Sequence, residues 1–316
     1  MELKIGDEIE NFILEMHLKP LDNNKHIWKA YIKDSDIYFN LTIKKKEIID
    51  IEPIINQIIS FGDDKFIIKK MIGDGTYGSV NIIQDIKTDR LYAIKFFKET
   101  SEAIREYKYY IKLFNCPYIP QIYYKTNNCI VMNKFEDNLY HKKLYSFDIL
   151  NISKNILSAI SFMHQQNIVH GDIKLENILI DNFKNGYLCD FSNSFNVNSF
   201  VEEISTIYYR APENCDPANN TEEGYIINTP SDIWSFGITF LAMFNKGSVP
   251  KYFKVSDPDK LYNRISTQSD IDEEIEDVIE NNHYFIDFAK LLLNVDPKKR
   301  ITAKNALEIL NNIKEF

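Results

Sequence analysis

Several features are scarce in this chain of 316 residues, and each scarcity excludes a class of protein. The four cysteines form no C-x-x-C pair, which is typical of free thiols in a reducing compartment. No stretch approaches roughly 18 consecutive apolar residues, so we expect no membrane helix and no membrane partner. Lysine and arginine number 37 against 46 acidic residues, and the net charge of −9 argues against nucleic acid as a partner.

The remaining composition is that of an ordinary globular protein, with 44% hydrophobic and 26% charged residues. At about 150 residues per domain, the length predicts two domains or lobes. The first residues, MELKIGDEIENF, are acidic and lack the apolar core of a secretory signal. We therefore expect an intracellular protein of the cytoplasm or nucleus, or of a host cell if an AT-rich large DNA virus encodes it.

The chain begins with β-rich patterns and ends with helical ones. Short aromatic and β-branched runs predict strands in the first 64 residues, with turns at 22–24 and 34–36 and a helix or linker at 44–60. Residues 66–100 and 121–132 also have strand character, whereas 99–114, 151–166 and most of the chain after 145 have helical character. We therefore expect an α+β fold of two unlike lobes behind a small β-rich N-terminal extension.

A faint internal repeat links residues 12–44 with residues 66–98 at a constant offset of 54 positions. Phe12 matches Phe66, and Tyr38 matches Tyr92. The first segment contains no glycine loop, so it lacks the means to bind phosphate as the second could. Coincidence in a chain rich in isoleucine and lysine is the simpler interpretation.

Three of the ten glycines fall within six residues, in the pattern G-x-G-x-x-G-x-V that ends at Val80. Backbone N–H groups without neighbouring side chains can close over phosphate oxygens. Strand character continues after Val80, which disfavours a dinucleotide-binding turn, although a plain glycine hairpin stays open. Lys95 follows in a strand of apolar residues, where it needs an anionic partner, and both a phosphate and Glu106 are candidates.

A second cluster of polar residues lies between the predicted helix 151–166 and a later strand. The segment His170–Asn177 reads H-G-D-I-K-L-E-N, and Asp190 follows 13 residues later. Two carboxylates and an amide oxygen suit phosphoryl transfer, because one carboxylate orients or deprotonates an acceptor hydroxyl and the other oxygens hold Mg²⁺. Lys174 would stabilise the transferring phosphoryl charge.

Taken together, these motifs resemble those of the eukaryotic protein kinase family. Further matches are Y-R-A-P-E at 209–213, D-I-W-S-F-G at 232–237, and D-P with R-I-T at 296–302. The resemblance runs from about residue 66 to residue 310, and Lys174 at its position is typical of the Ser/Thr branch. The Y-R-A-P-E segment resembles that of cyclin-dependent kinases. The expected domains are an extension at 1–64 and a kinase domain at 65–316, with an N-lobe to about 134 and a C-lobe from about 135.

The resemblance implies a role for each motif residue. Asp172 would be the catalytic base, Lys95 would hold the α- and β-phosphates of ATP and pair with Glu106, and Asn177 and Asp190 would bind Mg²⁺. Arg300 would pair with Glu213. The remaining residues implied to bind ATP are Ile72, Gly73, Asp74, Gly75, Thr76, Tyr77, Gly78, Ser79, Val80, Ala93, Met132, Asn133, Phe135 and Leu179.

The chain departs from the family pattern at two positions. Gly171 stands where many members carry the arginine that receives an activation-loop phosphate, so we hypothesise a kinase that needs no loop phosphorylation. Ser192 replaces the glycine after Asp190-Phe191, and serine is less free to adopt a positive φ. Thr206 resembles the family threonine that contacts the catalytic aspartate.

Two other functions fit the sequence less well. A pseudokinase scaffold is disfavoured by the complete set of charged motif residues, and a small-molecule phosphotransferase of the aminoglycoside or choline type by Lys174 and the A-P-E segment. We expect protein substrates with Ser or Thr acceptors. The acidic segment 270–280 is interpreted as an amphipathic helix with a solvated face, and 214–228 as a polar surface loop. Residues 1–64 match no motif and could bind a regulatory partner.

Overall fold

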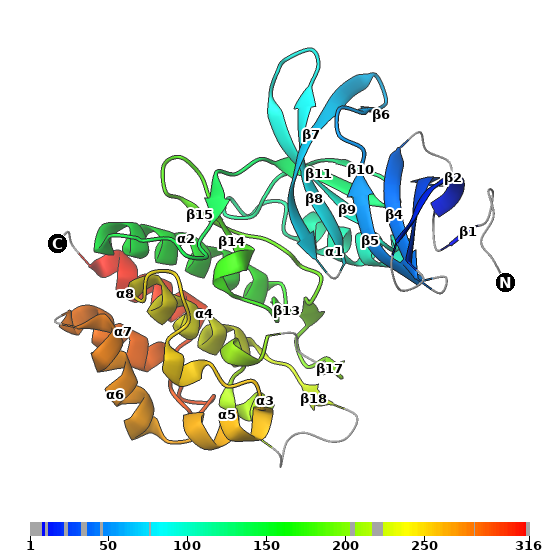
Figure 1. The fold of residues 1–316 in the computed structure, drawn as a ribbon. Helices are drawn as coiled ribbons and strands as arrows, with labels where there is room; N and C mark the ends of the chain where they lie inside the picture. The colour runs from blue at the N-terminus through cyan, green and yellow to red at the C-terminus, as the bar shows by residue number, and fades with distance from the viewer. Residues whose placement is uncertain are drawn as a thin grey trace. The chain divides into compact units, whose positions relative to one another are not determined.

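The computed structural model describes residues 8–9, 12–21, 25–32, 37–44, 47–75, 77–202, 206–216, 224–280 and 282–313. The chain divides into two compact units (Figure 1). The first unit comprises Met1–Lys108 and Gln121–Lys134, and the second comprises Tyr109–Pro120 and Phe135–Phe316. Within the described ranges, no helix is both long and apolar enough to cross a membrane.

The first unit begins with a five-stranded antiparallel sheet whose order follows the chain. Its strands are β1 (Glu8–Ile9), β2 (Phe12–Leu21), β3 (Lys25–Ile32), β4 (Tyr38–Lys44) and β5 (Glu47–Pro53). The prediction of a helix or linker at 44–60 is wrong, because β5 pairs with β4 and its isoleucines favour extended backbone. The predicted turns at 22–24 and 34–36 lie outside the described residues.

A second antiparallel sheet of the first unit has the order β10-β11-β9-β8-β7-β6. Its strands are β6 (Ile58–Phe61), β7 (Asp64–Gly75), β8 (Gly78–Asp85), β9 (Leu91–Phe97), β10 (Ile122–Lys125) and β11 (Cys129–Asn133). Helix α1 (Thr100–Lys112) follows β9, where the sequence predicts a helix. The strands predicted in 66–100 and 121–132 are likewise confirmed.

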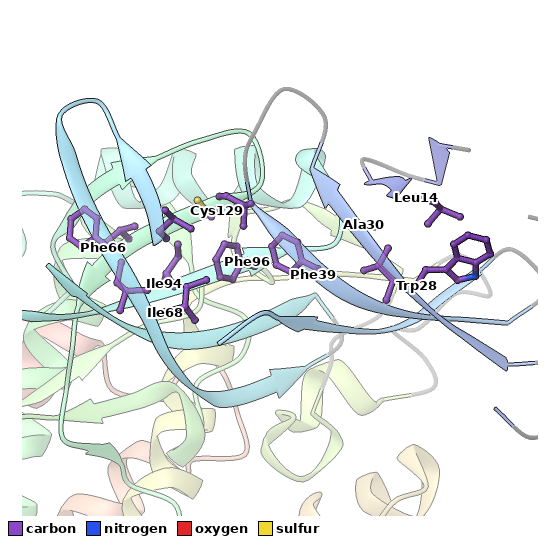
Figure 2. Packing of buried hydrophobic residues seen from close by; sticks show 14 of the residues in the cluster. Leu14, Trp28, Ala30, Phe39, Phe66, Ile68, Ile94, Phe96 and Cys129 are labelled. Carbon is purple, nitrogen blue, oxygen red and sulfur yellow. The ribbon is translucent and has the colours of Figure 1, made fainter. Parts of the chain in front are cut away.

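The two sheets share one hydrophobic core, which Figure 2 shows from close by. Trp28 and Phe39 of the first sheet and Phe66 and Phe96 of the second are among its buried residues. The rings of Phe39 and Phe96 meet edge to face, with centroids 5.0 Å apart. Strands β2, β3 and β4 are therefore packed into the core of the first unit.

The faint sequence repeat corresponds to a repeat of the backbone. The β2–β3 ladder shifts register between Leu14 and Met16 and again between His17 and Lys19. The β7–β8 ladder shifts between Ile68 and Lys70 and again between Met71 and Gly73, 54 positions later in both cases. The two register shifts of the first hairpin thus recur at the offset of the sequence repeat, so the backbone repeats over these strands.

The second unit is mainly helical, as predicted. Its helices are α2 (Ser146–Gln165), α3 (Pro212–Cys215), α4 (Thr229–Phe244), α5 (Pro258–Ile265), α6 (Gln268–Ile279), α7 (His283–Leu292) and α8 (Ala303–Asn312). Its short strands are β12 (Asp137–Asn138), β13 (Ile168–Val169), β14 (Ile178–Ile180), β15 (Gly186–Leu188), β16 (Phe195–Asn196), β17 (Phe200–Val201) and β18 (Tyr225–Ile226). Helix α2 begins five residues before the predicted 151–166, and α4 is buried along most of its length.

Two sequence predictions for surface segments have different outcomes. Helix α6 buries Ile271, Ile275 and Ile279 at helical spacing, so the amphipathic helix predicted at 270–280 is confirmed. The surface loop predicted at 214–228 is wrong at both ends, and its residues 217–223 lie outside the described residues. Asn214 and Cys215 at its start belong to α3 and are buried, and Tyr225 and Ile227 at its end are also buried. Strand β18 pairs there with β17, and this ladder turns two apolar side chains inward.

Candidate active site

The glycine motif forms the tip of the β7–β8 hairpin. Gly75 pairs with Gly78 across the tip, and Thr76 lies outside the described residues. Gly78 has a φ of +149°, and a Cβ there would lie 1.8 Å from the backbone oxygen of Phe96. A Cβ at Gly73 or Gly75 would meet nothing closer than 3.8 Å. Only Gly78 is therefore required by the fold itself, whereas bare backbone at the other two leaves room for a ligand.

The other residues of the motif lie around this tip. Ile72 and Asp74 are exposed, Tyr77 is half-buried, and Ser79 is buried beside Phe96 of β9. The backbone N–H of Lys98 donates to the Tyr77 carbonyl at 3.1 Å. The hairpin is thus tied to the strand that carries Lys95.

One face of the second sheet gathers several residues predicted to bind ATP. Val80 lies opposite Lys95 in the β8–β9 ladder, and Met132 lies opposite Ala93 in the β9–β11 ladder. Side chains directly opposite one another, or two apart in one strand, share a face. Val80, Ala93, Lys95 and Met132 therefore line the same face. Asn133 ends β11, where its side-chain oxygen accepts from the Gln121 N–H at 2.6 Å.

Lys95 and Glu106 form a buried ion pair. The Lys95 Nζ lies 2.6 Å from Glu106 Oε2, and the two side chains are only 11% and 1% exposed. Helix α1 supplies Glu106, and the Lys95 Nζ also lies 5.0 Å from the centre of the Phe97 ring. Removing two charges from water costs free energy, and strongly buried charged groups are common at functional sites. The burial of this pair therefore favours a functional role.

Asp172 is the centre of a network in the second unit. Its Oδ2 accepts from Lys174 Nζ at 2.7 Å and from Asn177 Nδ2 at 3.1 Å. Its Oδ1 accepts from the Thr206 hydroxyl at 2.8 Å, and Lys174 also reaches that hydroxyl at 3.1 Å. The sequence predicts the first three residues as a set and Thr206 as the contact of the aspartate, and the structure brings all four together.

The loop that carries Asp172 is anchored by Asp232 of α4. The Asp232 carboxylate accepts from the backbone N–H groups of His170 at 2.8 Å and Gly171 at 3.0 Å, and lies 2.9 Å from His164 Nε2. In the sequence, Asp232 is part of the D-I-W-S-F-G motif, which does not indicate this role. A lone carboxylate at the start of an otherwise apolar helix is the signal that could have revealed it.

Asn177 and Asp190 lie on two segments that are joined directly. Asn177 precedes β14 and Asp190 follows β15, and the backbone N–H of Cys189 donates to the Asn177 carbonyl at 3.0 Å. Both N–H bonds of the Asn177 amide that are described go to Asp172, at 2.8 and 3.1 Å, which turns the amide oxygen away from it. In the described part of the chain, no three His, Cys, Asp or Glu residues form a metal cluster.

These two side chains fit Mg²⁺, which binds proteins through one or two oxygen ligands and completes its shell with water and phosphates. Asp190 has a φ of +66°, a strained conformation that recurs at functional sites. The Ser192 hydroxyl donates to Asp190 Oδ1 at 2.7 Å. The positive φ thus falls on Asp190, not on Ser192, and the serine holds the carboxylate instead of resisting the turn.

Phe135 and Leu179 belong to the second unit. The Phe135 ring lies 4.6 Å from that of Tyr187, and Leu179 pairs with Tyr187 across the β14–β15 ladder. Leu179 is half-buried. Leu179 therefore lies in the β14–β15 hairpin that separates Asn177 from Asp190, and the Phe135 ring packs on Tyr187 of this hairpin.

Two further groups of residues lie outside the reacting cluster. Arg300 binds Glu213 through both nitrogens at 2.7 and 2.9 Å, as the resemblance implies, and its guanidinium lies 5.1 Å from the Trp234 ring centre. Cys129 and Cys215 are not in disulfides, and burial raises the pKa of Cys129 to about 11 and that of Cys215 to about 12. Such thiols stay protonated and unreactive.

Comparison with known proteins agrees with this geometry. A family model described as the protein kinase domain matches residues 66–310. The serine/threonine-protein kinase SBK1 of Danio rerio is 30% identical over 202 residues, which are 57% of this chain and 50% of that protein. The chain thus spans about half the length of this curated relative. The family match covers most of the chain and every motif described above, and the chain belongs to the protein kinase domain family.

Proposed function

We propose that this protein is a serine/threonine protein kinase that transfers the γ-phosphate of ATP to protein hydroxyls with the help of Mg²⁺. The observation that carries the proposal is the bonding of Asp172 to Lys174 and Thr206 at 2.7 and 2.8 Å. The name of the zebrafish relative supports the same acceptor class. Protein substrates are those expected of the family.

Asp172 would orient the acceptor hydroxyl and take its proton as the phosphoryl group departs from ATP. Lys174 lies beside it and would stabilise the charge that spreads over the transferring oxygens. Thr206 and Asn177 hold the two carboxylate oxygens, so the carboxylate cannot rotate away from the acceptor. The loop supplies a positioned base beside a fixed positive charge.

The first unit would hold the nucleotide. Lys95, kept in place by Glu106, would bind the α- and β-phosphates, while bare backbone at Gly73 and Gly75 would approach them closely. Val80 and Ala93, together with Leu179, would pack on the adenine, with Met132 behind it and Asn133 and Phe135 in the hinge. Asn177 and Asp190 would hold Mg²⁺, which neutralises phosphate charge when bound.

The proposal is tested by phosphate transfer from labelled ATP with Mg²⁺, offered to the protein itself and to generic Ser/Thr substrates. Asp172→Ala should lower incorporation about 10³-fold or more, while nucleotide affinity stays within about threefold. Asp181→Ala is the control, because Asp181 caps the β14–β15 turn and does not contact Asp172. Nucleotide binding without any transfer would instead favour the scaffold, and transfer only to small hydroxyl compounds a small-molecule kinase.

The same site supports activity without loop phosphorylation. Gly171 has a φ of +78°, and a Cβ there would lie 2.4 Å from the backbone oxygen of Asn193. An arginine at this position would force the backbone apart, so this chain lacks a phosphate receptor there for steric reasons. The segment after Asp190 is held in a different way.

Apolar contacts and strand pairing hold that segment. The activation-segment cluster consists of four buried residues, Val169, Val201, Tyr225 and Ile227, and Phe195 and Val197 pack against it. Strand β17 pairs with β18 and β16 pairs with β13, so the segment is bonded at two places. These contacts need no added charge, and they would keep Thr206 beside Asp172.

Two kinds of substitution separate this form of control from phosphorylation. Ser199→Ala and Ser205→Ala should leave activity within about twofold, although Ser205 lies outside the described residues. Val201→Ala should lower activity at least about fivefold because it opens the cluster. Phe200→Ala is its matched control, since Phe200 is the neighbouring residue and is 52% exposed. Loss of activity in the serine variants would show that the protein depends on phosphate.

A further inference from the structure

The repeat of the backbone extends to the faces of the two sheets. Strands β3 and β4 pair in the same register as β8 and β9, at an offset of 53 positions. The offset falls from 54 to 53 because Leu21 pairs with Lys25 at the first tip, whereas Gly75 pairs with Gly78 at the second. The meander β2–β4 thus has a counterpart, strand by strand and bulge by bulge, in β7–β9.

Equivalent residues of the two meanders point into the same core. Each of these pairs joins a buried residue of β2–β4 to its buried counterpart in β7–β9, and all of them belong to the shared core: Leu14 and Ile68, Ala30 and Ile83, Leu41 and Ile94, Ile43 and Phe96. The two sheets therefore bury the same face against each other, as two copies of one unit do in an isologous dimer.

The opposite faces differ in chemistry. In the second meander this face carries Lys95, and the equivalent position of the first meander is Thr42. The first meander also lacks glycine from residue 7 to residue 61, so it has no equivalent of Gly78. The repeated part is the packing face, and the nucleotide chemistry belongs to one copy alone.

We propose that β2–β4 is a second copy of the β7–β9 meander that acts as a built-in support for Lys95, with Phe39 as the positioning residue. This inference rests on the proposed function, because it concerns the same lysine. Phe39 is fully buried and its ring meets that of Phe96 at 5.0 Å and 86° (Figure 2). Phe96 follows Lys95 directly in β9.

Phe96 links the support to both parts of the nucleotide face. Its side chain points into the shared core, so Lys95, one residue earlier, points to the other face. Its carbonyl oxygen fills the space that a side chain at Gly78 would need. A shift of Phe96 would therefore move Lys95 relative to Glu106 and move the tip of the phosphate loop together with it.

A matched pair of variants in β4 of the full chain tests this support. Phe39→Leu removes the ring that packs on Phe96, whereas Tyr38→Leu removes the neighbouring ring, which faces away toward Tyr31 and Lys29. The first readout is amide hydrogen exchange of the nucleotide-free protein. Phe39→Leu should speed exchange in β8, β9 and α1 about tenfold and leave α4 unchanged, and Tyr38→Leu should change neither.

The second readout is the dissociation constant for Mg·ADP. Phe39→Leu should raise it about three- to tenfold, and the effect should shrink in a Glu106→Gln background, because both changes act through Lys95. Leu41→Val serves if Phe39→Leu fails to fold, since it removes one methylene from the same interface. Equal exchange in β9 for the Phe39 and Tyr38 variants, or fully additive effects with Glu106→Gln, would overturn the inference.

The two readouts also separate this inference from the function on which it rests. Wild-type protein that binds no nucleotide would refute the proposed kinase function, and the exchange comparison would still decide whether Phe39 supports β9. Nucleotide binding with unchanged exchange in β9 would refute the support and leave the kinase function intact.

Discussion

The two sheets of the first unit share a path of the chain and differ in what they carry. Both have the same two bulges in the first hairpin, and both bury the same face in one core. The β7–β9 meander has a glycine tip and the buried Lys95, while β2–β4 has Thr42 at the position equivalent to Lys95. The meander thus forms without the glycines. The residues that we propose bind nucleotide are found on one face of the second copy.

The ion pairs of the two sheets differ in the same sense. Lys29 and Glu15 of the first sheet lie 2.6 Å apart with side chains 32% and 36% exposed, whereas Lys95 and Glu106 lie 2.6 Å apart and are almost fully buried. Equal distances therefore have unequal consequences, because water screens the first pair and not the second.

The sharpest test of this comparison exchanges equivalent residues for alanine. Lys95→Ala should lower kcat/KM for phosphoryl transfer about 10²- to 10³-fold because it removes the charge that we propose binds the phosphates. Thr42→Ala, at the equivalent position of the first sheet, should stay within about twofold. Steady-state kinetics with Mg·ATP measure both. A large loss in the Thr42 variant would mean that the first sheet has chemistry of its own.

The two ion pairs predict different stabilities. Glu106→Gln should lower the free energy of unfolding by about 3 kcal/mol, because it removes the negative charge that faces the buried Lys95 ammonium group. Glu15→Gln should lower it by less than about 1 kcal/mol, since Lys29 stays in contact with water. Urea unfolding measures both values. Similar losses in the two variants would contradict the contrast drawn from burial.

The glycine tip divides into a structural and a binding part. Gly78→Ala should cost about 2 kcal/mol or more of stability, because its φ of +149° and the Phe96 oxygen leave no place for a methyl group. Gly73→Ala should change stability by no more than about 0.5 kcal/mol, because the nearest atom lies 3.8 Å away. Thermal unfolding separates the two, and nucleotide affinity should fall in both.

The smallest expected effect is on the pH dependence of stability, and it comes from Asp64 in the second sheet. The Tyr124 hydroxyl, which donates to Asp64 at 2.5 Å, and then the nearby Lys87, lower the pKa of Asp64 from its ordinary 3.8. A lowered pKa stabilises the fold above the unfolded value, and this contribution is lost as the pH falls through the folded pKa. Asp64→Asn should lower Tm at pH 7 and flatten its fall below about pH 4. If the Tm of Asp64→Asn falls below pH 4 as steeply as that of the wild type, Asp64 does not contribute to the acid dependence of stability.

The sequence predicts those parts of the molecule whose pattern is local. Helical character with few breakers predicts the helix at 99–114, and apolar residues at helical spacing predict the helix at 270–280. Ordered polar residues predict the grouping of Asp172, Lys174 and Asn177. Each of these depends on neighbours in the chain or on motifs of fixed spacing. The kinase domain family follows from the motifs as well, and the family match agrees.

Other features depend on partners far away in the sequence. The isoleucine spacing of residues 44–60 predicts a helix or linker, because spacing alone does not reveal that β4 pairs with β5. Tyr225 is buried because β17 lies beside it, and Gly171 is required because the Asn193 backbone approaches it. The sequence matches have a constant offset of 54, whereas the ladders give 54 for β2 and 53 for β3 and β4, and only the structure reveals this change.

The two meanders belong to one chain, and this affects whether another protein could bind the face of the second meander on which the first one packs. Strands β5 and β6 are separated by only residues 54–57, so the first meander is presented to the second at an effective concentration that is in the millimolar range for short linkers. A free protein at about micromolar concentration would need an affinity roughly a thousand times higher to take the same face. The linkage of the two sheets in one chain is therefore sufficient to keep soluble proteins from binding the core-facing side of the sheet that carries Lys95.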